Sequence, residues 1–271
     1  MPPPAPSSKL FDTQATEYAK YRPTYPDELY DAIYAFADLP SYGVALDVAT
    51  GSAQAALKLT DKFERVVAID PNEKMLSMAQ PHPNLELRFG SAENLDVPPE
   101  SVDLITVAQA LHWFDLRRFY SEAKRVLSPH GALAAWTYGL ARFEDNPVAS
   151  DIIHNFCWKD MGPYWAHNAR DLTARTHTEL PPLPEEFGVV ETRMMEMRKA
   201  MPFLDFLRYL ETWSSYNTFK KDHPDARDPL LDFREECMTA LRLNDESEVV
   251  TVVFDLAVIL AKQKCNDSDQ V

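Results

Sequence analysis

The sequence of 271 residues predicts an α/β fold, in which a seven-stranded, mostly parallel sheet has helices packed on both faces. Three observations lead to this prediction. Short apolar runs alternate with helical stretches, those runs are rich in Val, Ile and Leu, and no helix follows the last of them. Strands of this composition are buried on both faces, as in a parallel sheet covered by helices. The final run therefore predicts an antiparallel seventh strand, which closes one edge of the sheet together with the sixth.

The order of the predicted strands and helices places the ligand site at one edge of the sheet. Right-handed crossovers bring the carboxyl ends of parallel strands to a common edge. Ligands of such sheets bind at that edge, beside the first strand, where the strand order reverses. The first half of the chain is expected to form strands at residues 44–48, 65–69, 85–89, 102–107 and 133–136, and helices at 53–62, 73–79 and 119–127.

Additional helices are predicted at the start of the chain. Residues 9–37 have helical spacing of apolar residues but contain Pro23 and Pro26. Because a proline disfavours helical conformation in the residue before it, two helices are expected there, as a cap on the sheet. Residues 1–8 are expected to be a disordered leader.

The second half of the chain departs from the alternation of strands and helices. Residues 139–187 are rich in aromatic residues and proline, which predicts an insertion over the strand ends with a helix at 147–159. The remaining elements are expected to be strands at 188–200 and 248–262 and amphipathic helices at 203–220 and 229–242.

The composition limits the classes of partner. Lys and Arg number 27 against 42 Asp and Glu, and the resulting net charge of −15 would repel phosphate backbones. We therefore expect a small-molecule substrate and no nucleic acid. Three scattered cysteines predict neither a disulfide framework nor a zinc site, and no metal is expected. The absence of a long apolar run or signal-peptide pattern predicts a cytoplasmic protein that does not bind membranes. The sequence leaves the oligomeric state open, with a monomer favoured.

A small-residue loop after the first strand is the central feature of the sequence. The strand ends at Val48, and the loop contains Gly51, one of only seven glycines in the chain. A loop of small residues between a strand and a helix lets backbone N–H groups approach a ligand closely. By itself, the loop is equally compatible with an ordinary turn between a strand and a helix. The residues that follow the other strands decide whether it is a ligand-binding loop.

Acidic and polar residues follow the other strands at the same predicted edge. Asp47 lies in the first strand, and Asp70 follows the second, 23 residues later. A carboxylate at that spacing can accept hydrogen bonds from both hydroxyls of a ribose. Asp70 could instead act as a helix cap or turn residue before Pro71. Further candidates come after strands three and four, at residues 91–93 and 109–114.

Together these residues resemble the class I S-adenosylmethionine-dependent methyltransferases, and among them the trans-aconitate-methyltransferase-like (methyltransferase type 11) branch. The resemblance covers residues 11–262. The motifs that carry it are Phe11-Asp12, Tyr18-Ala19-Lys20-Tyr21-Arg22-Pro23, Leu46-Asp47-Val48-Ala49-Thr50-Gly51, Val67-Ala68-Ile69-Asp70-Pro71, Ala108-Gln109-Ala110-Leu111-His112-Trp113-Phe114-Asp115 and Arg125-Val126-Leu127-Ser128-Pro129-His130-Gly131.

The resemblance implies a Rossmann-like sheet and S-adenosyl-L-methionine as cofactor. Residues 47–51 would face the methionine part of the cofactor, Asp70 its ribose, and Ala92 and Glu93 its adenine. The complete set of implied cofactor-binding residues is Tyr18, Arg22, Asp47, Ala49, Thr50, Gly51, Asp70, Pro71, Met75, Ser91, Ala92, Glu93 and Gln109.

The resemblance also implies a domain plan. We expect a single methyltransferase domain over residues 9–264 and a tail at 265–271. Its parts would be a helical cap (9–37), a cofactor-binding half (38–138), substrate-side lid elements (139–187 and 201–243) and two closing strands (188–200 and 248–262).

The expected reaction is methyl transfer to a small molecule, with a carboxylate oxygen favoured as acceptor. A carboxylate is ionised at pH 7 and needs no general base. His112 and Trp113 are candidates for orienting the acceptor, and His112 could alternatively be a base for a hydroxyl or amine. Arg170 is a weaker candidate for binding the acceptor. The candidate substrate residues are Phe11, His112, Trp113, Tyr164, Trp165, Trp213 and Tyr216, although Trp213 and Tyr216 could simply pack one helix on the sheet.

Two alanines depart from the family pattern. Ala49 and Ala53 stand where the family usually has glycine, and a Cβ at position 49 opposes a positive φ and a close approach of the ligand. We expect cofactor binding to be weakened but retained. This departure keeps a non-catalytic cofactor-binding relative open as an alternative. An NAD-dependent oxidoreductase is a weaker one, because Gln54 replaces the third glycine of that family's loop.

Overall fold

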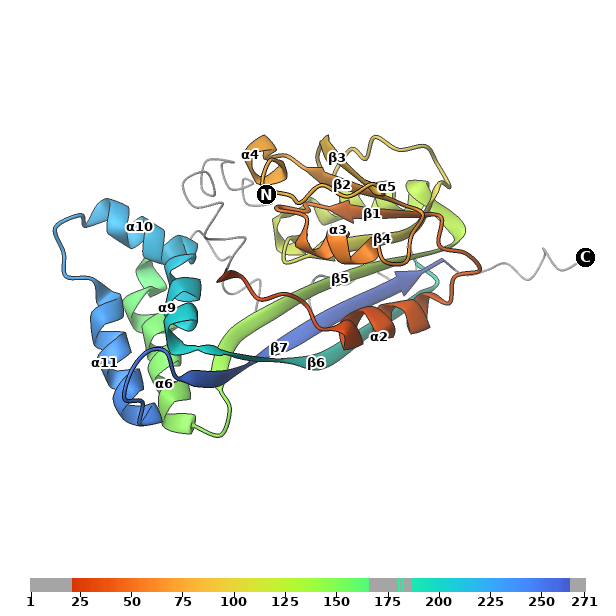
Figure 1. Ribbon diagram of the computed structural model, residues 1–271. Helices are drawn as coiled ribbons and strands as arrows, with labels where there is room; N and C mark the ends of the chain where they lie inside the picture. Colours follow the sequence, from red (N-terminus) through yellow and green to blue (C-terminus); the bar gives the residue numbers. More distant parts are fainter. Residues whose placement is uncertain (1–20, 166–179, 181, 183–186, 264–271) are drawn as a thin grey trace, which may run out of the picture.

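The computed structural model describes residues 21–165, 180, 182 and 187–263, and its centre is one seven-stranded sheet (Figure 1). The strands follow the order β3-β2-β1-β4-β5-β7-β6. Their bounds are β1 (Val44–Val48), β2 (Arg65–Asp70), β3 (Leu85–Phe89), β4 (Val102–Ala108), β5 (Leu127–Phe143), β6 (Val189–Pro202) and β7 (Val249–Lys262). Strands β1 to β5 pair in parallel, whereas β7 is antiparallel to both of its neighbours. The predicted Rossmann-like α/β fold with an antiparallel seventh strand is confirmed.

Helices cover both faces of the sheet. One buried cluster joins α2 and α3 to one face, and a second joins α5 to the other. The long helices of the second half lie together at the far end of β5, β6 and β7 (Figure 1). The helix bounds are α2 (Asp27–Ala37), α3 (Gln54–Leu59), α4 (Glu73–Leu76), η2 (Leu111–Trp113), α5 (Leu116–Val126), α6 (Pro147–Asn155), η3 (Phe156–Asp160), η4 (Gly162–Tyr164), α9 (Phe203–Glu211), α10 (Ser214–Asp222) and α11 (Pro229–Leu241).

Strand β5 is much longer than predicted. The sequence predicts a strand over residues 133–136 only, after Pro129 and Gly131. The structure instead continues the strand through them, with an irregular register opposite Val102 and Leu104. From Ala132 to Phe143, β5 pairs with β7. These long strands connect the sheet to the helices at its far end.

The predicted helix at 203–220 is wrong, because two helices occupy this segment. Helix α9 ends at Glu211, and Trp213 has an extended backbone conformation before α10 begins. The Thr212 hydroxyl donates a hydrogen bond to the carbonyl of Tyr209 at 2.6 Å. Such local bonding by a threonine competes with helix continuation and ends helices.

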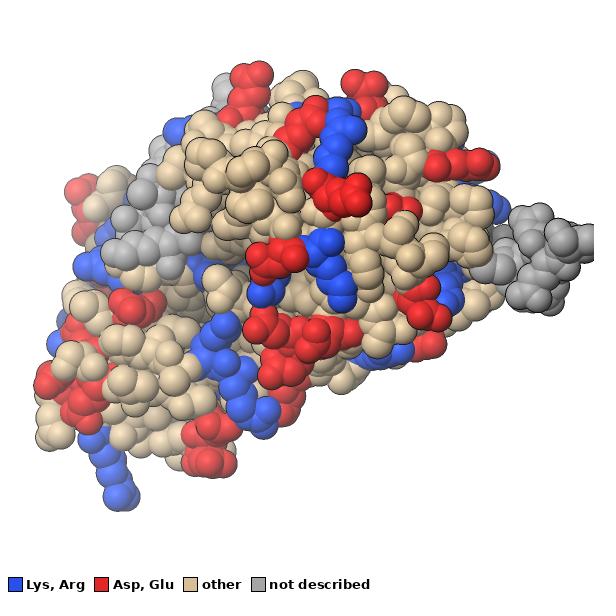
Figure 2. Space-filling model, turned by 45° about the vertical axis from the view of Figure 1, so that its right-hand side comes forward, with Lys and Arg blue, Asp and Glu red and all other residues tan. Residues whose placement is uncertain are grey.

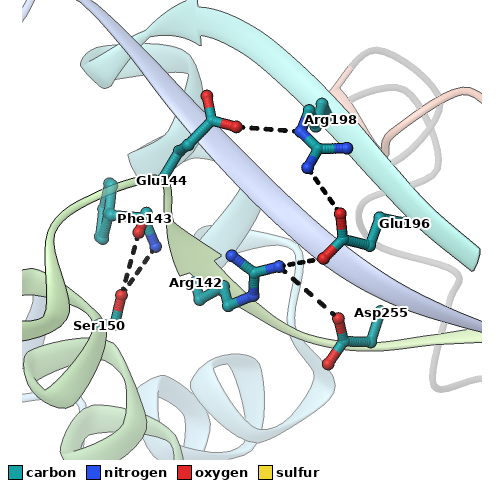
Figure 3. Close-up of polar contacts among 7 residues, drawn as sticks. All are labelled: Arg142, Phe143, Glu144, Ser150, Glu196, Arg198 and Asp255. Carbon is teal, nitrogen blue, oxygen red and sulfur yellow. Dashed lines mark hydrogen bonds and ion pairs between the residues drawn. The ribbon is translucent and has the colours of Figure 1, made fainter.

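A network of ion pairs crosses β5, β7 and β6 on one exposed face (Figure 3). Arg142 on β5 lies 2.5 Å from Glu196 on β6 and 4.0 Å from Asp255 on β7. Arg198 contacts both Glu196, at 2.6 Å, and Glu144, at 2.9 Å. Across the wider surface, acidic and basic side chains lie next to one another over much of the visible face (Figure 2). Within the described residues, no helix is long and apolar enough to span a membrane.

Aromatic packing and exposed ion pairs on the long strands should differ in their contribution to stability. Phe254 on β7 is fully buried against Tyr138 and Tyr209, so Phe254→Ala should lower the free energy of unfolding by about 3–5 kcal/mol. The Arg142 side chain is 42% exposed, so Arg142→Met should lower the free energy of unfolding by less than about 1 kcal/mol. Urea denaturation of both variants measures the difference. Equal losses would show that the ion pairs of Arg142 contribute as much to stability as the buried ring of Phe254.

Candidate functional site

A cavity of about 500 Å³ opens at the carboxyl ends of β1, β2, β3 and β4. The loop between β1 and α3 lines it, as do residues before α2 and on β5. The lining residues are Arg22, Pro23, Tyr25, Ala49, Thr50, Gly51, Ser52, Gln54, Ala55, Asp70, Pro71, Asn72, Met75, Ser91, Ala92, Glu93, Ala108, Gln109, Ala110, Trp113, Phe114 and Tyr138. Eleven of the thirteen predicted cofactor-binding residues are in this set; Asp47 lies beneath it, and Tyr18 lies outside the described residues.

Asp47 is a fully buried carboxylate below the cavity floor. Its Oδ2 accepts a hydrogen bond from the Thr50 hydroxyl and its Oδ1 accepts one from the Thr106 hydroxyl, both at 2.5 Å. Burial raises the pKa of Asp47 to about 6, although the two hydroxyl donors oppose the shift. Because Thr50 belongs to the loop and Thr106 to β4, the carboxylate ties the loop to the neighbouring strand.

Asp70 holds the other side of the loop. Its Oδ2 accepts a hydrogen bond from the backbone N–H of Gly51 at 2.7 Å, and its Oδ1 accepts one from Asn72 at 2.8 Å. Burial raises the pKa of Asp70, and these two donors oppose that shift. Each carboxylate oxygen accepts about two hydrogen bonds, so the side chain keeps acceptor capacity toward the cavity. The turn interpretation of Asp70 and a ligand-binding role are therefore compatible.

The loop has three residues in the left-handed conformation. Ala49, Gly51 and Ala53 have φ angles of 55°, 58° and 61°. This conformation costs a residue with a Cβ about 1–2 kcal/mol, which explains why glycine suits positions 49 and 53. The alanines therefore do not prevent the left-handed turn, and the hydrogen bonds to Asp47 and Asp70 hold it in place.

Gln109 and Arg22 bring hydrogen-bond donors to the cavity from different elements. Gln109 follows β4 with a φ of 59°, and its Oε1 accepts a hydrogen bond from the Thr137 hydroxyl at 2.7 Å. Its Nε2 is buried with no hydrogen-bond partner in the described part of the chain. The Arg22 guanidinium donates to the Tyr138 hydroxyl and to the carbonyl of Thr212, both at 3.3 Å. These groups suit ligand oxygens.

The predicted acceptor residues separate into two groups. Trp113 lines the cavity, whereas His112 packs beside it and is absent from the lining. Burial lowers the pKa of His112 to about 4, which makes it a weaker base than an ordinary histidine. The other described candidates, Tyr164, Trp165, Trp213 and Tyr216, do not line this cavity.

Those four aromatic residues pack among the helices at the far end of the sheet. Trp165 and Trp213 have ring centroids 5.4 Å apart, and Tyr216 donates a hydrogen bond to Asp228 at 2.7 Å. Tyr164 lies 3.1 Å from the ring nitrogen of His223. Their substrate role stays a prediction, and the packing expected for Trp213 and Tyr216 is observed. Phe11, Tyr18 and Arg170 lie outside the described residues.

Several residues in or beside the cavity were not predicted from the sequence. Tyr25 and Tyr138 reach the cavity only because α2 packs near β5, which no local pattern reveals. Thr106 and Thr137 are buried hydroxyls within otherwise apolar strands. Such isolated polar residues are the signal that could have identified them, since a buried hydroxyl requires a partner.

Comparison with known proteins identifies the family. Residues 46–135 match a methyltransferase domain family. The chain is 32% identical, over 97% of its length and 98% of the relative, to a candidate methyltransferase of Dictyostelium discoideum. It is 28% identical, over 79% of its length and 84% of the relative, to a candidate S-adenosylmethionine-dependent methyltransferase of Saccharomyces cerevisiae. The chain belongs to the S-adenosylmethionine-dependent methyltransferases.

A solved structure supports the same family over most of the fold. It is a candidate type II methyltransferase from Anaeromyxobacter dehalogenans, with 32% identity and a TM-score of 0.77. The match covers 89% of this chain and 97% of that one. The family resemblance inferred from the motifs is thus confirmed, while membership of the trans-aconitate branch stays a prediction. The methyltransferase assignment excludes the NAD-dependent alternative.

The residues at the cavity suit S-adenosylmethionine, the cofactor of this methyltransferase family. Asp70 offers carboxylate lone pairs of the kind that ribose hydroxyls require, and the buried Gln109 Nε2 lacks a protein acceptor. Ala49 has only a methyl side chain and Gly51 has none, which leaves room for a ligand at the loop. No cluster of three or more metal-ligating side chains occurs among the residues described.

The buried carboxylate of Asp47 should make stability depend on pH. The pKa of Asp47 is raised to about 6 in the folded chain, from an ordinary value of 3.8, so its ionisation opposes folding as pH rises through this window. Asp47→Asn cannot ionise. Relative to the wild type, its free energy of unfolding should therefore increase between pH 4 and 7, by on the order of 3 kcal/mol. Urea denaturation across this range measures the difference, and a constant difference would show that Asp47 ionises normally.

The methyl group of Ala49 should weaken cofactor binding. Ala49→Gly should bind S-adenosylhomocysteine about three- to tenfold more tightly, because a strained turn and a group lining the cavity are both relieved. Calorimetric titration measures the affinity. Ala53→Gly is the matched control, since Ala53 has the same conformation but does not line the cavity. Weaker binding by Ala49→Gly would contradict the expectation.

Proposed function

We propose that this methyltransferase transfers a methyl group to a small-molecule acceptor, with a carboxylate oxygen as the favoured nucleophile. The supporting observation is the kind of ionisable group at the cavity. Among the described lining residues, Arg22 is the cation, and none is histidine, cysteine or lysine. A phenol or amine acceptor needs a base near neutral pKa, whereas a carboxylate is already ionised and benefits from a nearby guanidinium.

We further propose how the lining residues divide between cofactor and acceptor. Asp70 would hold the ribose hydroxyls, and the segment from Ser91 to Glu93 would border the adenine. The small loop of Ala49 and Gly51 would border the methionine part. Arg22, Tyr25, Trp113 and Tyr138 then remain on the cavity wall for the acceptor and the charged end of the cofactor.

The chemistry requires alignment and exclusion of water. When bound, the cofactor would supply a methyl group on a sulfonium: a bond would form between the acceptor oxygen and the methyl carbon as the C–S bond opposite breaks, and the sulfur would leave as the neutral thioether of S-adenosylhomocysteine. The aromatic rings of Trp113 and Tyr25 provide negative faces that suit a positive sulfur, and their bulk excludes water. Arg22 is fixed by Tyr138 and the Thr212 carbonyl, so its charge is already positioned before an acid binds. His112, partly buried and with its pKa lowered to about 4, is expected to pack and not to act as a base.

A screen of labelled methyl transfer from S-adenosylmethionine to small acids, phenols and amines should detect acids as acceptors. Methyl esters release their label as volatile methanol in alkali, whereas methylamines and phenol ethers do not, so this readout identifies the bond formed. At saturating S-adenosylmethionine, where any effect on cofactor binding is removed, Arg22→Met should reduce transfer at least about tenfold, because an ionised acid then loses its cation. Arg125→Met, which removes a cation away from the cavity, is the control. Transfer only to amines or phenols would contradict the carboxylate proposal, and cofactor binding without any transfer would indicate a non-catalytic relative.

A further inference from the structure

Gln109 is held to strand β5 at two points. Its backbone N–H donates to the carbonyl of Trp136 at 2.9 Å, and its side-chain Oε1 accepts from the Thr137 hydroxyl at 2.7 Å. The backbone contact supports a φ of 59°, a conformation that costs glutamine about 1–2 kcal/mol. Strain of this kind persists where the surroundings over-determine a conformation, and it concentrates at functional sites.

The contact with Thr137 also determines which end of the amide stays available. Thr137 is only 3% exposed, and its hydroxyl hydrogen is satisfied by Oε1. If the Gln109 amide were rotated by half a turn, Nε2 would take the place of Oε1 beside Thr137. The Thr137 hydroxyl hydrogen would then lose its acceptor. In the observed orientation Nε2 is buried with two hydrogens and no partner among the described residues, although Gln109 lines the cavity. A buried donor without a partner costs about 1–3 kcal/mol, which an oxygen of a ligand would recover.

A second donor at the cavity, Arg22, is bound to the neighbouring residue of β5. Tyr138, directly after Thr137, accepts a hydrogen bond from Arg22, which also lines the cavity. Two consecutive residues of β5 thus contact a neutral amide donor and a cationic donor. An amide donor combined with a guanidinium suits a carboxylate.

We infer that Thr137 is a positioning residue for cofactor binding: its hydroxyl turns the Gln109 amide so that the nitrogen donates to the carboxylate at the amino-acid end of the cofactor. Thr137 acts through Gln109 and makes no contact with the ligand itself. The inference builds on the proposed placement of the cofactor but is independent of the methyl acceptor. It would hold for an enzyme that methylates acids, phenols or amines.

The experiment compares two ligands that differ at the amino-acid end. S-adenosylhomocysteine carries the carboxylate, whereas 5′-methylthioadenosine shares the nucleoside and sulfur but lacks it. Binding of each to the full-length protein is measured by calorimetry for wild type, Thr137→Val, Thr137→Ser and Gln109→Glu. Valine has the shape of threonine without the hydroxyl, and serine keeps the hydroxyl without the methyl group.

Thr137→Val should weaken S-adenosylhomocysteine binding about five- to tenfold, the equivalent of one hydrogen bond, and change 5′-methylthioadenosine binding less than about twofold. Thr137→Ser should keep the wild-type ratio of the two affinities. Gln109→Glu replaces the donor with an anion, so its loss should be larger and again restricted to the ligand with the carboxylate. A purely structural role would weaken both ligands together.

The inference is overturned if Thr137→Val binds S-adenosylhomocysteine as the wild type does, if both ligands weaken equally, or if Thr137→Ser is as impaired as Thr137→Val. Thermal unfolding of each variant shows whether it is folded, and the ratio of affinities is unaffected by a reduced folded fraction. Failure of the proposed acceptor chemistry would appear only in the methyl-transfer screen. If the cofactor does not bind as proposed, the wild type itself would not bind S-adenosylhomocysteine.

Discussion

The site depends on Asp47, a fully buried carboxylate that accepts hydrogen bonds from the hydroxyls of Thr50 and Thr106. Asp47 lies between Thr50 of the loop and Thr106 of β4, so one side chain joins the ligand-binding loop to the strand beside it. Burial of the ion is unfavourable, and the short hydroxyl contacts partly offset this. The contacts of Asp47 nevertheless attach the loop to the sheet, and this attachment helps to hold the loop residues in the left-handed conformation. Asp70 adds a second attachment at Gly51.

The order of the strands and the position of the site could be predicted because they follow from local pattern and chain topology. Val44–Val48 is a recognisable buried strand, and Asp70 and Gln109 come directly after strands that must end at the same edge. What could not be predicted depends on contacts between distant segments. The run from Ser128 to Gly131 contains a proline and a glycine, yet it belongs to β5, where the pairing with β4 shifts register between Val102 and Leu104.

The aromatic residues of the second half illustrate the same limit. Trp213 and Tyr216 have the residue types of a substrate pocket, but their neighbours in the fold are Phe156, Trp165 and Asp228. Residue type alone does not distinguish a pocket wall from a helix interface, because both use large rings with one polar atom. Conversely, Thr137 has an unremarkable place in the sequence, and only its hydrogen bond to Gln109 connects it with the site.

Arg22 has one further consequence for how the molecule works as a whole. Its guanidinium contacts Tyr138 on the sheet, the carbonyl of Thr212 between α9 and α10, and the ring of Tyr209 at 5.4 Å. A ligand that binds the Arg22 guanidinium therefore weakens or strengthens the contacts by which Arg22 joins the sheet to the helices. Because such linkage is reciprocal, whatever loosens the α9–α10 junction also alters affinity at the cavity. The distant helical layer is in this sense part of the binding equilibrium, and sequence changes far from the ligand can tune it.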